Sequence, residues 1–433
     1  MFCGLAMIKK LNSIFARVLA DDLLRHVSIL FSGMMVVHVC NMVFQMAVSR
    51  ALPKEEYALL AAFLGVLAII QRPLGTLGTG VSHYSSLLQQ DGRTGDVRRL
   101  LRKWLLLTGA VGLFLGVTAV VFNEPLSGFL HLSRVAPVVI AGVLFPVLFC
   151  TPVLGGAARG LQLFGWSSAS MIFGAVARLG LGAGFVWFLY PACGWAMLGH
   201  GFGVYTSAVI LFVGLYLVLR GNRKSTEALP SMRVYLLQSF FIQTAYAILM
   251  TADVVLMKHY IPEDTEFAYA ATLGRMVVFL PGAIVAAMFP KVASSGTMSS
   301  AQRTIFIRSF SYTASFVLLA VVGCALFPGL LARILFGITD ASVYLKRMIG
   351  LMALVMGFSA LLNVIIQFLV AQRRFKPAFS IVGFACLYLI GVMGFHANSG
   401  QVVAVSAGCN AGALLFGLIA VIRLNAAVLP IDG

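Results

Sequence analysis

The segments SRALPKEEYALLAAFLG (residues 49–65) and KHYIPEDTEFAYAATLG (residues 258–274) align without a gap. In both, a proline and acidic residues precede an alanine pair, and a Leu-Gly dipeptide ends the match. The matched positions are Pro53 and Pro262, Ala61 and Ala270, Ala62 and Ala271, Leu64 and Leu273, and Gly65 and Gly274. Each segment connects a first apolar stretch to a second one, so we predict that the chain consists of two halves with the same architecture.

The composition is that of a protein that lies mostly within a lipid bilayer. Of the 433 residues, 60% are hydrophobic and only 10% are charged, and the mean hydropathy is +0.97. Soluble proteins carry about 25% charged residues. Apolar runs of about 20 residues, the length that spans a bilayer, recur along the chain. We therefore predict a polytopic membrane protein.

The net charge of +17 would suggest a nucleic-acid partner in a soluble protein. Here the basic residues lie in short, scattered loops, as they do on the cytoplasmic side of membrane proteins. Arg98, Arg99 and Arg102 belong to one such loop, whereas acids such as Glu55 and Glu263 collect on the opposite side. We therefore expect both termini in the cytoplasm and predict no nucleic-acid partner.

Twelve apolar runs predict an all-α polytopic fold with about 12 transmembrane helices. The runs cover residues 27–49, 57–82, 104–123, 135–156, 168–190, 195–219, 234–258, 267–290, 310–336, 348–371, 378–396 and 402–423. Both halves begin on the same side of the membrane, so they form two six-helix halves related by pseudo-two-fold symmetry about the membrane normal. In that architecture a central cavity between the halves takes the substrate. The sequence thus indicates a transporter.

The same runs divide the chain into five parts. These are an amphipathic cytoplasmic lead-in (1–26), an N-terminal six-helix half (27–220), a cytoplasmic linker (221–233), a C-terminal six-helix half (234–423) and a cytoplasmic tail (424–433). No connection between the predicted helices is long enough to form a folded domain outside the membrane.

Four ionisable residues fall well inside predicted helices: Arg72, Arg178, Arg275 and Asp253. A charge in the membrane is costly, so it usually faces an aqueous cavity or a partner. Structural ion pairing is the alternative role, and Arg72 could also reach the cytoplasmic interface. Arginine offers a planar fork that matches phosphate, and almost no acid accompanies the three arginines. We therefore predict that Arg275, Arg178 and Arg72 bind an anionic substrate.

Asp253 and Arg275 lie at the same predicted depth. Asp253 precedes Pro262 by nine residues, and Arg275 follows Glu266 by nine. At about 1.5 Å per residue, both lie about 13 Å below the turn that joins their helices. We predict an ion pair between them, and Asp253 is the only embedded acid that could couple transport to an ion gradient.

The sequence contains no motif for catalysis, ATP binding or a metal site. RGNRKST (220–226) lacks the spacing of a P-loop, and neither HExxH nor GxSxG occurs. The seven cysteines occur singly, without a CxxC pair. His38 and His200 could move protons, although isolated histidines usually have structural roles. We predict no enzymatic activity and no cofactor, with coupling to an H⁺ or Na⁺ gradient left open.

The segment TADVVLMKHYIPEDTEFAYAATLGRMVVFLPGAIVAAMFPKVA (251–293) resembles the central signature of polysaccharide-exporter proteins. In that family the seventh helix carries an acid, an outer turn leads to a Y..A..LGR pattern, and the eighth helix ends in FPk. Residues 49–80, 158–182 and 363–383 are similar to other parts of the same family, so the resemblance covers most of the chain. These proteins belong to the multidrug/oligosaccharidyl-lipid/polysaccharide exporter superfamily.

The resemblance implies a flippase that moves a polyprenyl-diphosphate-linked oligosaccharide across the bacterial inner membrane by alternating access. The cargo would be a repeat unit for lipopolysaccharide O-antigen, exopolysaccharide or capsule. Lipid II flippases of the superfamily carry a helix-eight arginine that contacts the diphosphate, and Arg275 stands at the matching place. Their fourteen-helix layout is absent, which argues against lipid II as the cargo.

The implied partners are the lipid-linked oligosaccharide, bilayer lipid, a glycan polymerase and glycosyltransferases. An ion-coupled exporter of small molecules or drugs from the same superfamily is the alternative. A membrane glycan polymerase or ligase would need a long external loop with catalytic residues, and the sequence offers none.

Overall fold

The computed structural model describes residues 22–129, 131, 136–220, 233–278, 281–282, 284–285, 288, 292 and 300–426. Within these residues the chain contains helices and no strand, and eleven helices are long and apolar enough to cross a membrane. The predicted all-α polytopic fold is confirmed. Residues 1–21 of the predicted lead-in lie outside the described residues, as do most of the predicted linker and tail.

The N-terminal half contains the six predicted spans, although α4 begins at Thr94, ten residues before the predicted start at residue 104. Its helices are α2 (Asp22–Ala51), α3 (Lys54–Gln90), α4 (Thr94–Val121), the short α5 (Asn123–Phe129), α6 (Ala136–Gly160), α7 (Phe164–Phe188) and α8 (Cys193–Leu219). Residues 22–26, which we assigned to the lead-in, belong to α2, because a helix satisfies its own backbone hydrogen bonds and can continue beyond the apolar run. For the same reason α3 extends about 12 Å beyond residue 82.

The C-terminal half contains two helices that are broken where the sequence predicted continuous spans. Its helices are α9 (Arg233–Tyr260), α10 (Glu266–Met276), α12 (Ser300–Leu326), α13 (Pro328–Phe336), α14 (Val343–Ala371), the short α15 (Phe375–Ala378), α16 (Ser380–Gly394) and α17 (Ser399–Ala426). The two exceptions are the eighth and ninth predicted spans, and a proline accounts for each.

The eighth span, predicted over residues 267–290, is interrupted directly after Arg275. Helix α10 ends at Met276, and Val277 and Val278 form a turn. Pro281 follows Val277 by four residues and has no N–H to donate to its carbonyl oxygen, so the helical hydrogen-bond ladder cannot continue unbroken.

The ninth span, predicted as one helix over residues 310–336, is two helices. Helix α12 starts earlier, at Ser300, and ends at Leu326. Pro328 then opens α13 at the start of a helix, where its missing N–H costs nothing. Gly337 ends α13 with a φ of 74°, a conformation that glycine adopts freely.

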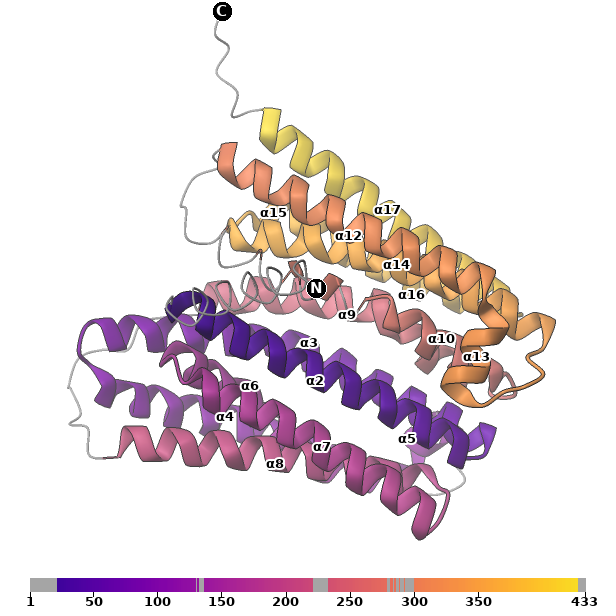
Figure 1. Ribbon diagram of the computed structural model, residues 1–433, viewed down its shortest axis with the longest axis horizontal. Helices are drawn as coiled ribbons and strands as arrows, with labels where there is room; N and C mark the ends of the chain where they lie inside the picture. Colours follow the sequence, from indigo (N-terminus) through magenta and orange to yellow (C-terminus); the bar gives the residue numbers. More distant parts are fainter. Residues whose placement is uncertain are drawn as a thin grey trace, which may run out of the picture.

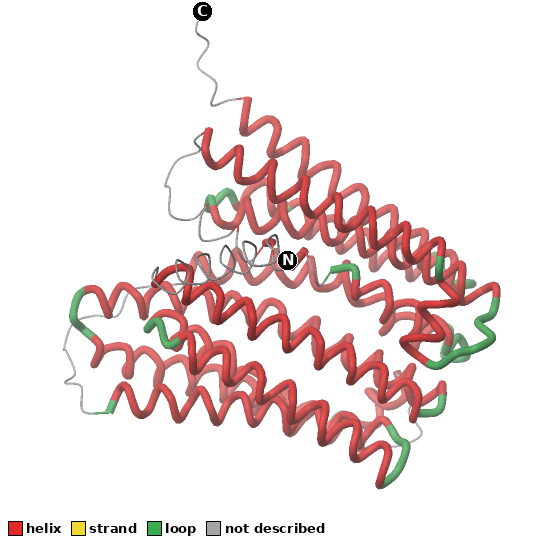
Figure 2. The backbone as a smooth tube through the Cα atoms, in the orientation of Figure 1, coloured by secondary structure: helices red, strands yellow, loops and turns green. Residues whose placement is uncertain are grey.

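The helices form two bundles that correspond to the two halves of the chain. Figure 1 shows α2–α8 in one bundle and α12, α14, α16 and α17 in the other, with α9 and α10 between them. Connecting loops lie mainly at the two ends of the molecule (Figure 2). The bundles converge near α10 and α13 and diverge toward the opposite end, where the chain passes from α3 to α4 (Figure 1).

Contacts join the two halves at the end where the bundles converge, and α3 also packs against α9 farther along, at Arg72 and Tyr246. The Tyr57 hydroxyl lies 3.1 Å from Thr272 Oγ1, and the Tyr57 ring stacks on Tyr269 at 4.5 Å between centroids. Arg50 donates from Nη2 to the carbonyl oxygen of Ile334 at 2.5 Å. The two repeated segments, 49–65 and 258–274, therefore touch each other across the boundary between the halves.

Candidate functional site

The N-terminal half encloses a cavity of about 460 Å³ between α6, α7 and α8, with α2 and α3 completing the wall. Each of the three helices presents one stripe of residues at the three- and four-residue spacing of a helix face. The stripes are Leu148, Thr151, Pro152, Gly155 and Arg159 on α6; Ser167, Ser170, Met171, Gly174, Ala175 and Arg178 on α7; and His200, Gly203, Val204, Ser207 and Leu211 on α8. Small residues dominate these stripes, and their short side chains leave the space that forms the cavity.

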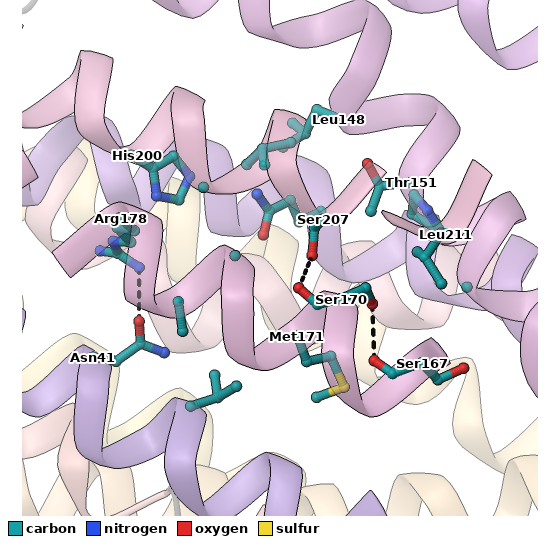
Figure 3. A pocket seen from close by; sticks show the side chains of 18 of the residues that line it. Asn41, Leu148, Thr151, Ser167, Ser170, Met171, Arg178, His200, Ser207 and Leu211 are labelled. Carbon is teal, nitrogen blue, oxygen red and sulfur yellow. Dashed lines mark hydrogen bonds between the residues drawn. The ribbon is translucent and has the colours of Figure 1, made fainter. Parts of the chain in front are cut away.

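Arg178, which the sequence predicts to bind the substrate, lies at one end of this cavity (Figure 3). Its Nη1 donates to Asn41 Oδ1 of α2 at 3.1 Å, and its guanidinium carbon lies 4.3 Å above the ring of Phe44. Its Nε has no hydrogen-bond partner among the described residues. The side chain is thus positioned by neutral groups and keeps donor capacity.

His200 lies beside Arg178 at the same end of the cavity (Figure 3). Neither ring nitrogen has a hydrogen-bond partner within the part of the chain that the structure describes. We did not assign His200 to the site from sequence, because a single histidine in an apolar helix gives no signal that it faces an arginine on another helix.

Arg159 is a further cation of this cavity that sequence reasoning missed. It stands in the last turn of α6, next to a loop, where an arginine is expected in any membrane protein. Side chains of a helix lean toward its N-terminus, and for α6 that direction leads into the bundle. The guanidinium lies beside Gly155 and Gly78. A Cβ added to Gly155 would lie 3.3 Å from its Nη1, and one added to Gly78 would lie 3.2 Å from its Nη2.

Among the described residues that line the cavity, none is an aspartate or a glutamate. Arg178 and Arg159 therefore create a region of positive potential in a wall of hydroxyl, glycine and apolar groups, and the His200 ring lies beside Arg178. Opposite charges attract more strongly in such a medium than in water. The arrangement favours an anionic ligand over a cationic one.

The C-terminal half holds the other embedded charges, Asp253 and Arg275, as an ion pair. Arg275 Nη2 contacts Asp253 Oδ1 and also lies 3.4 Å from the carbonyl oxygen of Thr251. Asp253 is 2% exposed, and its Oδ2 has no hydrogen-bond partner among the described residues. The two helices thus bring together the two residues that the sequence placed at one depth.

Arg72 occupies a third location, between the halves. A cavity of about 320 Å³ lined by α3, α9 and α14 contains Arg72 together with Ser239, Gln243 and Gln367. The guanidinium lies 4.3 Å above the ring of Tyr246, and Nη1 lies 3.1 Å from the sulfur of Met250. The sequence assigned the three arginines to one central cavity, but they lie in three separate environments. They belong to three different helices, α3, α7 and α10, which pack against different neighbours.

Metal binding finds no support in the described part of the chain, which contains no group of three or more His, Cys, Asp or Glu residues arranged around a common centre.

The fold is shared with solved structures of membrane transporters. No protein-family model and no curated protein matches the sequence. An inward-facing multidrug resistance MATE family transporter of the MOP superfamily superposes with a TM-score of 0.66 over 93% of this chain and 100% of its own, at 14% identity. An outward-facing MATE family transporter gives 0.63 over 93% and 96%, also at 14% identity. The MATE multidrug transporter DinF-BH gives 0.67 over 92% and 94%, at 17% identity.

These likenesses define the class of fold. The chain has the two-bundle fold of MATE transporters of the MOP superfamily, which confirms the predicted arrangement of two six-helix halves. Because the sequence identities are only 14–17%, these structural likenesses establish the fold alone.

Proposed function

We propose that the protein is a transporter that works by alternating access of its two halves and binds an anionic substrate in the cavity of the N-terminal half. The observation that carries the proposal is the pair of arginines at that cavity, Arg178 and Arg159, with no carboxylate among the described residues of its lining. The matching solved structures of inward-facing and outward-facing transporters support the alternating-access part.

The fold comparisons favour export of a small molecule over the lipid-linked oligosaccharide suggested by the sequence pattern. The solved structures compared above are described as multidrug transporters. The charge of the cavity adds a restriction, because a site lined by cations repels a cationic drug. An exporter of anionic small molecules is therefore the function that fold and cavity together support best.

Flipping of a diphosphate-linked oligosaccharide stays as the second candidate, because two observations favour it. The cavity suits a phosphate group. Arg275 stands where the resemblance implies a diphosphate contact, paired with Asp253. In this scheme the aspartate holds the arginine until the substrate displaces it, and Arg72 contacts the substrate between the halves.

Two dyes with the same xanthene ring system and opposite charge test the charge preference directly. We expect purified protein in lipid nanodiscs to bind anionic sulforhodamine B at least tenfold more tightly than a cationic rhodamine ester, as measured by fluorescence anisotropy. Loss of one charged hydrogen bond costs about 1.5–3 kcal/mol, so Arg178→Gln should weaken sulforhodamine B binding about 10- to 100-fold. Arg102→Gln, an exposed cation on α4 outside the cavity, is the matched control. Tighter binding of the cationic dye would contradict the proposal.

A deletion strain distinguishes the two cargo classes. If the protein flips lipid-linked oligosaccharide, the strain should accumulate that lipid in the cytoplasmic leaflet and lose surface glycan. If it exports anionic small molecules, glycan should be unchanged and intracellular sulforhodamine B should rise.

A further inference from the structure

The cavity of the N-terminal half is elongated, and its two arginines belong to opposite ends. The three lining stripes each extend over eleven residue steps, from 148 to 159, from 167 to 178 and from 200 to 211. Eleven residues of helix correspond to about 16 Å. Because α6 and α8 run antiparallel to α7, Arg178 and His200 share one end, whereas Arg159 shares the other with Ser167 and Leu211. Figure 3 shows Arg178 and His200 together, away from Ser167 and Leu211.

The two arginines also differ in their surroundings. Arg178 is partly buried and fixed by Asn41 and Phe44. Arg159 is exposed, and within the described residues it has no hydrogen bond or ion pair. Its guanidinium lies against Gly155 and Gly78, whose missing side chains leave room for it at the exposed end of the cavity.

The wall between the two ends offers few free donors. The hydroxyl of Thr151 donates to the carbonyl oxygen of Val147 at 2.7 Å, and that of Ser170 to the carbonyl oxygen of Ser167 at 2.8 Å. Ser207 donates to the carbonyl oxygen of Ser170 at 2.7 Å. Because these hydroxyl groups already donate to backbone carbonyl oxygens, they have no proton left to donate to an anion. An anion is therefore attracted mainly by the arginines at the two ends of the cavity.

From these observations we infer that Arg159 is a capture site for the anion at the open end of the cavity, from which the anion passes to Arg178 and His200 at the closed end. The inference rests on the proposed function, because it assigns a path to the same anionic substrate. The ligand class is a carboxylate, sulfonate or phosphate group on a molecule narrow enough for the cavity. A charge at a rim accelerates association and makes it depend on salt, whereas the buried end site determines how slowly the ligand leaves.

Stopped-flow binding of sulforhodamine B to the protein in nanodiscs tests the capture role. We expect Arg159→Gln to slow association about 5- to 20-fold at about 20 mM NaCl and to remove most of its salt dependence, with dissociation changed less than about twofold. Arg159→Lys keeps the charge and should retain most of the rate. Arg102→Gln removes a cation outside the cavity and should change neither rate, and melting temperatures in detergent verify that each variant is folded.

The outcomes separate the capture role from the proposed function. If Arg159→Gln leaves association unchanged, or if it raises dissociation as Arg178→Gln should, the capture role is overturned while the anion site stands. If wild-type protein does not bind sulforhodamine B, the anion site itself is overturned and the capture role with it.

Discussion

Arg275 of α10 and Asp253 of α9 form an ion pair, and this pairing explains how each charge is tolerated within a membrane span. Arg275 is 16% exposed at its side chain and Asp253 is 2% exposed. Removing one partner of a buried pair typically costs about 3–5 kcal/mol, because the other charge is left unpaired. Helix α10 ends one residue after Arg275, so the pair lies beside a break in the helical hydrogen-bond ladder.

A double-mutant comparison tells whether this pair takes part in transport. We expect Asp253→Asn and Arg275→Ala each to impair transport of sulforhodamine B into proteoliposomes, with the double variant no worse than the poorer single variant. That pattern follows if both residues act in one exchangeable contact. Thermal unfolding of the same variants supplies the control. Strictly additive losses of transport would contradict the coupling, and full recovery of both transport and stability in the double variant would leave the pair with a structural role only.

The embedded residues show which parts of a site a membrane sequence can reveal. Arg178 and Arg275 were predictable, because a charge inside an apolar run stands out against its neighbours. Arg159 was not, since it lies at a helix end where basic residues are common. The grouping of Arg178 with His200 depends on the packing of α7 against α8, which no local pattern of either helix contains.

At the scale of elements, glycine decides how closely the helices of the N-terminal half approach. A Cβ added to Gly199 of α8 would come within 2.0 Å of the Cα of Gly182 on α7. Neighbouring helices of membrane proteins commonly meet at small residues, because the bilayer provides no hydrophobic driving force and close backbone contact supplies the attraction instead. This contact sets the spacing of the two helices that carry Arg178 and His200.

Substitution of this glycine should therefore separate α7 from α8. We expect Gly199→Ala to destabilise the protein by about 1–3 kcal/mol and to lower its melting temperature in detergent, because the backbone must move to admit one methyl group. Gly180→Ala is the matched control on α7, where an added Cβ meets none of the described residues within 4 Å. Equal melting temperatures for the two variants would show that the close approach is not required.

The positions of most membrane spans were predictable, whereas their interruptions were not. Runs of about 20 apolar residues identified the first seven spans and the last three. The eighth and ninth spans were predicted as continuous, because hydropathy averages over the effect of Pro281 and Pro328. Proline leaves the apolar character of a run intact while it removes one backbone donor. Proline alone does not identify such a break, because Pro73 of α3 and Pro146 and Pro152 of α6 lie inside continuous helices.

At the scale of the whole molecule, the two halves meet through their repeated segments. Tyr57 belongs to the first segment, and Tyr269 and Thr272 belong to the second. The gapless repeat predicts the two-half organisation, whereas the contact between the two repeated segments is a finding of the structure. The separate locations of Arg72, Arg178 and Arg275 follow from the packing of whole bundles, which the repeat does not describe.

Alternating access requires that contacts joining the halves at this end open during transport. Gly65 of α3 and Thr251 of α9 lie in different halves, and a Cβ on Gly65 would stand 3.6 Å from Thr251 Cγ2. A cysteine at position 251 would place its sulfur at a γ position like that of Thr251 Cγ2, so the pair Gly65→Cys and Thr251→Cys is close enough to test for a disulfide.

We expect oxidation of this double variant to stop sulforhodamine B transport in proteoliposomes and reduction with dithiothreitol to restore it, while equilibrium binding of the dye persists. Mass spectrometry of the cross-linked peptide verifies the bond. Gly75→Cys combined with Thr251→Cys is the control, because an added Cβ at Gly75 meets none of the described residues within 4 Å. Transport that continues at the wild-type rate through a fully cross-linked protein would show that α3 and α9 need not separate. Such a result would contradict alternating access by opening of the two halves at this contact.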